Sequence, residues 1–321
     1  MSTALIYILF IAGFYIVIKG ADLLIDGASS IAKKLHVSDL VIGLTIVALG
    51  TSAPELMVNI MASLQGNADI AIGNVLGSNI ANILLVLGLT SIIYPLSVQK
   101  NTILHAIPLS LLSAVIMGIL ANDIFFNGTG FSALTLGDGL VLLAFFIIFM
   151  FYTFSLSKTA KNLIESKTKE FGIIKSILLV LLGCVGLTLG GKWIVEGAIY
   201  AARVLGVSES LIGLTIVAVG TTVPELATGL VAAFKKKADI AIGTVVGSNI
   251  FNMFFVLGIS AVIRPLPFNT VHNTDVYVNI GVHLLLLVSM FIGAKRLLNK
   301  WKGSTFILLY ASYIVFLVIR G

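Results

Sequence analysis

Long runs of apolar residues, separated by short charged or turn-forming segments, alternate along the whole chain. A bilayer's hydrocarbon layer is about 30 Å thick and a helix rises about 1.5 Å per residue, so about 20 apolar residues suffice for one span. The runs predict helices near residues 4–26, 38–64, 70–95, 103–121, 133–156, 173–195, 208–234, 240–265, 276–295 and 303–320. We therefore predict an all-α integral membrane protein with ten transmembrane helices.

The second half of the chain repeats the first. Residues 41–82 read VIGLTIVALGTSAPELMVNIMASLQGNADIAIGNVLGSNIAN, and more than half of them are identical to residues 211–252. Residue n aligns with residue n + 170, as Glu55 does with Glu225. We divide the chain into a first five-helix repeat (1–156), a cytoplasmic linker rich in lysine (157–172) and a second five-helix repeat (173–321).

Five spans per repeat is an odd number, so the two repeats should have inverted topology in the membrane. Charge agrees: Gln65, Gly66 and Asn67 align with Lys235, Lys236 and Lys237, as expected if only the second loop is cytoplasmic. The same rule places both termini outside a multi-pass plasma-membrane protein. With 58% hydrophobic and 11% charged residues, the net charge of +6 reflects orientation in a lipid bilayer and predicts no nucleic-acid partner.

Each repeat contains a span that is interrupted by polar and helix-breaking residues, at 50–55 and at 220–225. Proline removes a backbone donor, so carbonyl groups near 48–51 and 218–221 should lose their helical partners and become available as oxygen ligands. A carboxylate inside a membrane is costly and usually marks an ion path, a proton relay or a charge pair. Glu55 and Glu225 are therefore the strongest candidates for a function, and the repeat should bring both to the midplane.

The next span of each repeat adds small and polar residues: Gly73, Gly77, Ser78, Asn79 and Asn82, and their equivalents Gly243, Gly247, Ser248, Asn249 and Asn252. Glycines alone would indicate helix packing. Carboxylate, hydroxyl, amide and backbone oxygens together suit calcium or sodium ions, and no resident cofactor is predicted.

Other polar residues are expected to be structural. Asp69 and Asp239 stand at span ends, where helix capping explains them. The four histidines and the lone Cys184 are interpreted as packing or interfacial residues. No serine–histidine dyad accompanies the glutamates, so an enzyme is not expected.

The doubled motifs, G-T-S-x-P-E with its repeat at 220–225 and G-S-N-I at 77–80 and 247–250, resemble those of the sodium/calcium exchanger family, in its compact prokaryotic ten-helix form. The resemblance covers essentially the whole chain. It implies that Glu55 and Glu225 bind calcium together with the backbone carbonyls of Thr51 and Thr221. It also implies flanking sodium sites that use Ala48, Ser52 and Ser78 in one repeat and Ala218, Thr222 and Ser248 in the other.

Asn82 matches the central asparagine of the family, whereas Asn252 stands where many members carry aspartate. Two intramembrane carboxylates then remain in place of three, which leaves the coupling ion open and weakens a potassium-dependent function.

The resemblance implies sodium/calcium antiport by alternating access. The main alternative is proton/calcium antiport, although proton-coupled relatives typically carry G-N-x-x-E in place of G-T-S-x-P-E. A passive cation channel is a further alternative, distinguished by flux without a counter-ion gradient.

Overall fold

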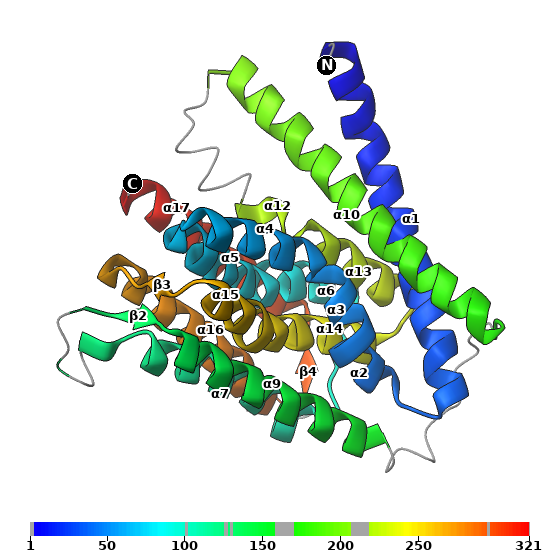
Figure 1. Ribbon diagram of the computed structural model, residues 1–321. Coiled ribbons are helices and arrows are strands. Elements are labelled where there is room, and N and C mark those ends of the chain that lie inside the picture. Colours follow the sequence, from blue (N-terminus) through cyan, green and yellow to red (C-terminus); the bar gives the residue numbers. More distant parts are fainter. Residues whose placement is uncertain are drawn as a thin grey trace.

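The structure is a computed structural model that describes residues 3–99, 102–124, 128, 131–157, 170–206, 218–293 and 296–320. Helices form almost all of it, and the strands are two-residue segments (Figure 1). The first half comprises α1 (Thr3–Leu35), α2 (Asp39–Ile42), η1 (Gly43–Val47), α3 (Ala48–Thr51), α4 (Ala53–Gln65), α5 (Ala68–Ala81), η2 (Asn82–Leu87), α6 (Gly88–Ile93), β1 (Leu96–Ser97), η3 (Thr102–Ala106), α7 (Ile107–Leu120), β2 (Ala133–Leu134) and α9 (Leu136–Ser157).

The second half repeats much of this order. It comprises α10 (Ile173–Val204), α12 (Ala218–Gly220), α13 (Val223–Phe234), α14 (Ala238–Ile250), η5 (Phe251–Val256), α15 (Leu257–Ile263), β3 (Leu266–Pro267), η6 (Thr270–His272), α16 (Asn273–Phe291), β4 (Leu297–Leu298) and α17 (Lys300–Arg320). The π-helical segments η2 and η5 occupy equivalent positions, directly after the asparagine-containing helices α5 and α14.

Eight helical stretches within the described residues are long and apolar enough to cross a membrane. A ninth consists of Asp39–Thr51 and Ala53–Gln65, which meet at an angle of 47°. The predicted seventh span, 208–234, is described only from residue 218 onwards, where α13 is apolar but short. The prediction of an all-helical membrane protein is confirmed, and the count of ten spans stays a prediction.

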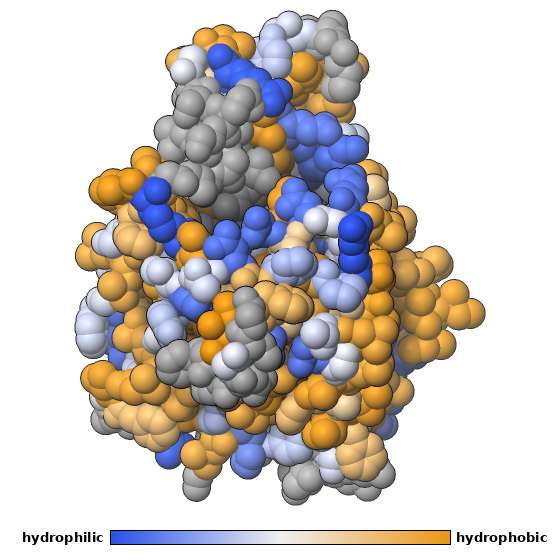
Figure 2. Space-filling view, turned by 60° about the vertical axis from the view of Figure 1, so that its left-hand side comes forward, coloured by the Kyte–Doolittle hydropathy of each residue, from blue (hydrophilic) through white to orange (hydrophobic). Residues whose placement is uncertain are grey.

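The outer surface of the described helices is strongly apolar, as a lipid-facing surface must be. Side chains such as Ile11, Phe151 and Ile174 are 70–78% exposed. Figure 2 shows hydrophobic residues along the flanks of one face, with hydrophilic residues gathered in its upper middle part. Inside this shell lie α5–η2–α6 and α14–η5–α15, of which the second is the more completely buried.

Helices α1 and α10 lie side by side along one edge of the molecule (Figure 1). They pack through glycines: a Cβ atom on Gly13 would lie 2.8 Å from the carbonyl oxygen of Gly190, and one on Gly20 would lie 2.9 Å from that of Gly183. The partner's number falls as the first number rises, so these two equivalent helices run antiparallel. Both extend beyond their predicted ends, α1 to Leu35 and α10 to Val204.

The longer C-terminal part of α1 has an electrostatic reason. Asp22 and Asp26, near the predicted end of this span, pair with the Nζ of Lys235 at 2.7 and 2.5 Å. The loop after α13 therefore neutralises these carboxylates where α1 continues.

Two short antiparallel ladders join the halves. Leu96 and Ser97 of β1 pair with Leu298 and Leu297 of β4, and Ala133 and Leu134 of β2 pair with Pro267 and Leu266 of β3. The strands β1 and β3 are equivalent in the repeat, so each half contributes one strand to each ladder.

Candidate functional site

Each half contains a helix that breaks immediately before a glutamate. In the first half α3 ends at Thr51, Ser52 leaves helical geometry (φ −81°, ψ 3°), and Pro54 and Glu55 lie in the first turn of α4. In the second half α12 ends at Gly220, and Pro224 and Glu225 lie in the first turn of α13. Proline is well tolerated in a first helical turn, where the positive end of the helix dipole also favours a carboxylate.

The break differs in detail from the prediction. The carbonyl of Ala48 keeps its helical partner, the amide of Ser52 at 2.9 Å, and also accepts from the hydroxyl of Thr51. The prediction that carbonyls lose their partners is therefore wrong for Ala48, because α3 stays helical to Thr51. Pro54 lacks the amide that would bond the carbonyl four residues earlier, at Gly50. In the second half the amide of Thr222 bonds the carbonyl of Val219, not the equivalent Ala218.

Both glutamates are completely buried, and they interact electrostatically with each other. Neither oxygen of the Glu55 side chain has a hydrogen-bond partner among the described residues, nor has Oε2 of Glu225. The other oxygen of Glu225 accepts from the hydroxyl of Ser248 at 3.3 Å. Within the described ranges no lysine or arginine pairs with either carboxylate, although buried charges ordinarily need a partner. The arrangement therefore calls for a bound cation or for protonation of the carboxyl groups.

Hydroxyl groups connect the two breaks to the opposite halves. The Oγ1 of Thr51 lies 3.2 Å from the Oγ of Ser248, and the Oγ of Ser78 lies 3.2 Å from the Oγ1 of Thr221. These pairs are equivalent under the repeat. Each break therefore faces a serine of the opposite half. Ser248 also donates to Glu225.

Four further buried oxygens in the same segments have no hydrogen-bond partner among the described residues. They are the hydroxyls of Ser52 and Thr222 and the Oδ1 atoms of Asn82 and Asn252. Together with the three glutamate oxygens they make seven partnerless oxygens within the predicted site. Uncommitted hard oxygens beside carboxylates are the ligand type that calcium and sodium prefer.

An asparagine cluster lies where α5 and α14 meet. The side-chain amide of Asn79 donates to the backbone carbonyl of Asn249 at 3.1 Å, and that of Asn249 donates to the backbone carbonyl of Asn79 at 3.3 Å. Asn82 donates to Oδ1 of Asn249, and Asn252 donates to Oδ1 of Asn79, both at 3.0 Å. In both Asn82 and Asn252 the side-chain nitrogen therefore donates a hydrogen bond, and the side-chain oxygen has no partner among the described residues.

A cavity of about 450 Å³ reaches Thr221, at the second break, from one side of the molecule. It begins at the exposed Asp69 and runs past Gly73, Asn74 and Gly77 to Thr221. No described residue comes within 4 Å of a Cβ atom built on Gly77.

The equivalent surface of α14 is closed. A Cβ atom on Gly243 would lie 2.9 Å from the carbonyl of Leu40, and one on Gly247 would lie 2.8 Å from that of Leu44. A separate cavity of about 490 Å³ near Asp39 and Asp239 reaches no residue of the predicted site. Of these two cavities, the one that begins at Asp69 is therefore the one that reaches the predicted site.

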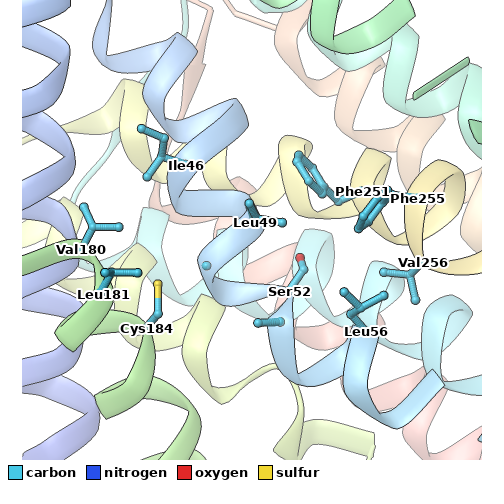
Figure 3. Close-up of a pocket in the computed structure, with 12 residues that line it drawn as sticks. Ile46, Leu49, Ser52, Leu56, Val180, Leu181, Cys184, Phe251, Phe255 and Val256 are labelled. Atoms are coloured by element: carbon cyan, nitrogen blue, oxygen red, sulfur yellow. The ribbon is translucent and has the colours of Figure 1, made fainter. Parts of the chain in front are cut away.

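A third cavity, of about 290 Å³, lies on the outer side of the first break, among α3, α4, α10 and η5 (Figure 3). Its lining includes Ile46, Leu49, Phe251 and Phe255, and Ser52 supplies the hydroxyl seen in Figure 3. Because the other lining side chains offer no oxygen ligands, this cavity is unsuited to a hydrated cation.

The structure thus brings together the predicted residues around the two breaks, with the side chain of Ala218 outside its description. Asp69 and Asp239 do not cap α5 and α14: the N-cap of α5 is Asn67, whose side chain accepts from the amide of Ile70. Asp69 contacts Nε2 of His272 at 3.0 Å, and Asp239 accepts from Gln99 at 2.7 Å. Both lie in a first helical turn, where the dipole still favours them.

Comparisons with known proteins agree with this geometry. A family model described as sodium/calcium exchanger protein matches residues 5–155 and 175–319. The chain is 32% identical to the sodium/calcium exchanger MaX1 of Methanosarcina acetivorans, over 97% of this chain and 98% of that protein. It is 34% identical to the inner membrane protein YrbG of Escherichia coli, over 83% and 81% respectively. It also superposes on the solved structure of the sodium-calcium exchanger NCX_Mj soaked with zero Na⁺ and Ca²⁺, with a TM-score of 0.83, 32% identity, and coverage of 98% of this chain and 100% of that one.

Proposed function

Because this chain belongs to the sodium/calcium exchanger family, we propose that it is a secondary active antiporter that exchanges sodium for calcium by alternating access. The observation that carries the proposal is the group of seven buried oxygens, three of them on Glu55 and Glu225, which lack partners in the described residues. Buried carboxylates that no basic side chain neutralises require a cation, and a transported cation meets that requirement.

The chemistry of these oxygens favours calcium and sodium as the transported ions. Calcium takes six to eight oxygen ligands in flexible geometry, and carboxylate, amide, hydroxyl and carbonyl oxygens are all available here. We assign calcium to Glu55 and Glu225 with the carbonyls of Thr51 and Thr221. The sodium sites are assigned to Ala48, Ser52, Ser78, Ala218, Thr222 and Ser248, and the two central amides to Asn82 and Asn252.

Charge balance explains why the ions compete. One calcium ion or two sodium ions neutralise the two glutamates, whereas an empty or half-filled site leaves charge in a poorly solvated place. Such a site should not change its access readily. With asparagine at 252, two carboxylates set this balance.

We further propose that the two repeats, 1–156 and 173–321, are inverted in the membrane and joined by a cytoplasmic linker. The antiparallel packing of the equivalent helices α1 and α10 supports this, since each is long enough to span. With the N-terminus outside, the cavity that begins at Asp69 opens to the exterior. Movement of α1 and α10 against the remaining helices would then close the opening to the exterior and open the site to the cytoplasm.

The decisive experiment is calcium uptake into proteoliposomes that contain the purified protein. We expect uptake when sodium is loaded inside, and no comparable uptake under an imposed pH gradient alone. Uptake driven only by the pH gradient would establish proton/calcium antiport instead. Rapid calcium flux without any counter-ion gradient would indicate a passive channel and overturn the proposal.

A further inference from the structure

We propose that His283 is a positioning residue that fixes which atom of Asn82 faces the cation. This inference rests on the proposed function, because it concerns a ligand of the proposed site. His283 lies in α16 and is completely buried. Its Nδ1 lies 2.7 Å from the backbone carbonyl of Asn279, and its Nε2 lies 3.2 Å from the side-chain nitrogen of Asn249.

These two contacts determine the protonation of the imidazole ring. A carbonyl oxygen can only accept, so Nδ1 must carry a hydrogen. The nitrogen of an asparagine carboxamide can only donate, so Nε2 must be without one. His283 is therefore neutral and held in a single tautomer, with Nε2 as a fixed acceptor inside the protein.

The fixed acceptor sets the orientation of Asn249. One hydrogen of its carboxamide goes to the carbonyl of Asn79 and the other to His283. A reversed carboxamide would place Oδ1 against two acceptors, the carbonyl oxygen and Nε2, and both contacts would be repulsive. Asn249 must then present Oδ1 in the opposite direction, toward Asn82.

The orientation passes to the proposed ligand in one further step. The nitrogen of Asn82 donates to Oδ1 of Asn249 at 3.0 Å, so Oδ1 of Asn82 is the atom left over. That oxygen is buried and has no hydrogen-bond partner among the described residues. If the acceptor at 283 were lost, only the carbonyl of Asn79 would still oppose reversal of Asn249. A reversed Asn249 would make Asn82 turn a nitrogen toward the cation. Nitrogen–hydrogen groups repel cations, so one ligand would become an obstacle.

The device belongs to one repeat only. The first repeat contains His36 and His105 but no histidine within α7, which packs on α14 as α16 packs on α5. In the second repeat, α16 packs on α5 and supplies the imidazole. The hydrogen bonds among the four asparagines are equivalent in the two repeats, but the histidine that orients them comes from the second repeat alone.

The test combines transport with a double-mutant cycle. We expect His283→Leu to raise the KM for calcium about tenfold, as loss of one good ligand would, with a smaller change in maximal rate. His283→Gln supplies an acceptor oxygen and a donor of its own, and should stay within about threefold of wild type. In an Asn82→Ala background, His283→Leu should change KM little further, because the ligand that it orients is already absent.

Full additivity of the two substitutions would overturn the inference, while a wild-type protein without sodium-driven uptake would instead refute the proposed function. A second measurement reads the tautomer directly and does not depend on transport. In protein labelled with ¹⁵N-histidine, one ring should show a protonated Nδ1 and an unprotonated Nε2 at neutral pH, and comparison with His283→Gln identifies it. Finding the opposite tautomer, or a charged ring, at position 283 would disprove the assignment.

Discussion

The thiol of Cys184 packs directly on Gly50, so that a Cβ atom at position 50 would lie 2.6 Å from its Sγ. Figure 3 shows this sulfur on α10 beside the end of α3, immediately before the first break. A helix proposed to move and a helix that carries proposed ion ligands therefore touch directly at this point.

The first prediction follows from that contact. Gly50→Ala should reduce sodium-driven calcium uptake severely, since the methyl group must displace Cys184 or shift the turn before Ser52. Cys184→Ala alone removes the sulfur and should cost little. The double variant should recover much of the lost uptake. If the double variant is as inactive as Gly50→Ala, the sulfur contact is not the cause.

The second prediction concerns the carboxylates. Glu55→Gln and Glu225→Gln should each abolish calcium uptake while leaving the protein folded, because each removes half of the charge that faces a divalent ion. Glu196→Gln is a suitable control, since Glu196 is a half-exposed residue that pairs with Lys192 on α10. Normal uptake by either site variant, or equal loss in the control, would remove the assignment.

The third prediction tests inverted topology. In a Cys184→Ala background, which has no native cysteine, a cysteine placed at Lys236 should react with a membrane-impermeant reagent only from the cytoplasmic side. A cysteine at Gly66, its repeat equivalent, should react only from outside. Reaction of both positions from the same face would refute the inverted repeat.

The fourth prediction concerns the ion pairs that hold the loop after α13 against α1. Lys235→Gln should lower the free energy of unfolding by about 1 kcal/mol, because partly exposed ion pairs contribute little individually. Lys236→Gln is the matched control, since the described residues give Lys236 no ion pair. Thermal unfolding in detergent measures both. Equal melting temperatures for the two variants would show that the pairs with Asp22 and Asp26 add nothing.

The positions of the two helix breaks were predictable because the same motif occurs twice in the sequence. Pro54 and Pro224 identified the helix breaks, and the glutamates that follow them are indeed buried at equivalent positions. Hydrophobic runs located most of the spans, although charge pairing allowed α1 to continue past its predicted end.

Three features could not be predicted in the same way. His283 stands alone in an apolar run and has no counterpart in the repeat, so no pattern distinguished it from a packing residue. The bonds between Asn79 and Asn249 depend on how α5 and α14 approach each other, which a single sequence does not specify. The closed surface at Gly247 and the cavity at Gly77 arise from the same motif, because one conformation gives identical sequences different neighbours.

The paired strands also bear on the order in which the protein can be completed during synthesis. Residues 96 and 97 find their partners at 298 and 297, so the first ladder closes only after almost the whole chain has left the ribosome. Until then the edge of β1 presents unpaired amides and carbonyls, and β2 must wait for residues 266 and 267. Contacts so distant in sequence form late and slowly. The first repeat must therefore stay in the bilayer with β1 and β2 unpaired until the second repeat has been synthesised.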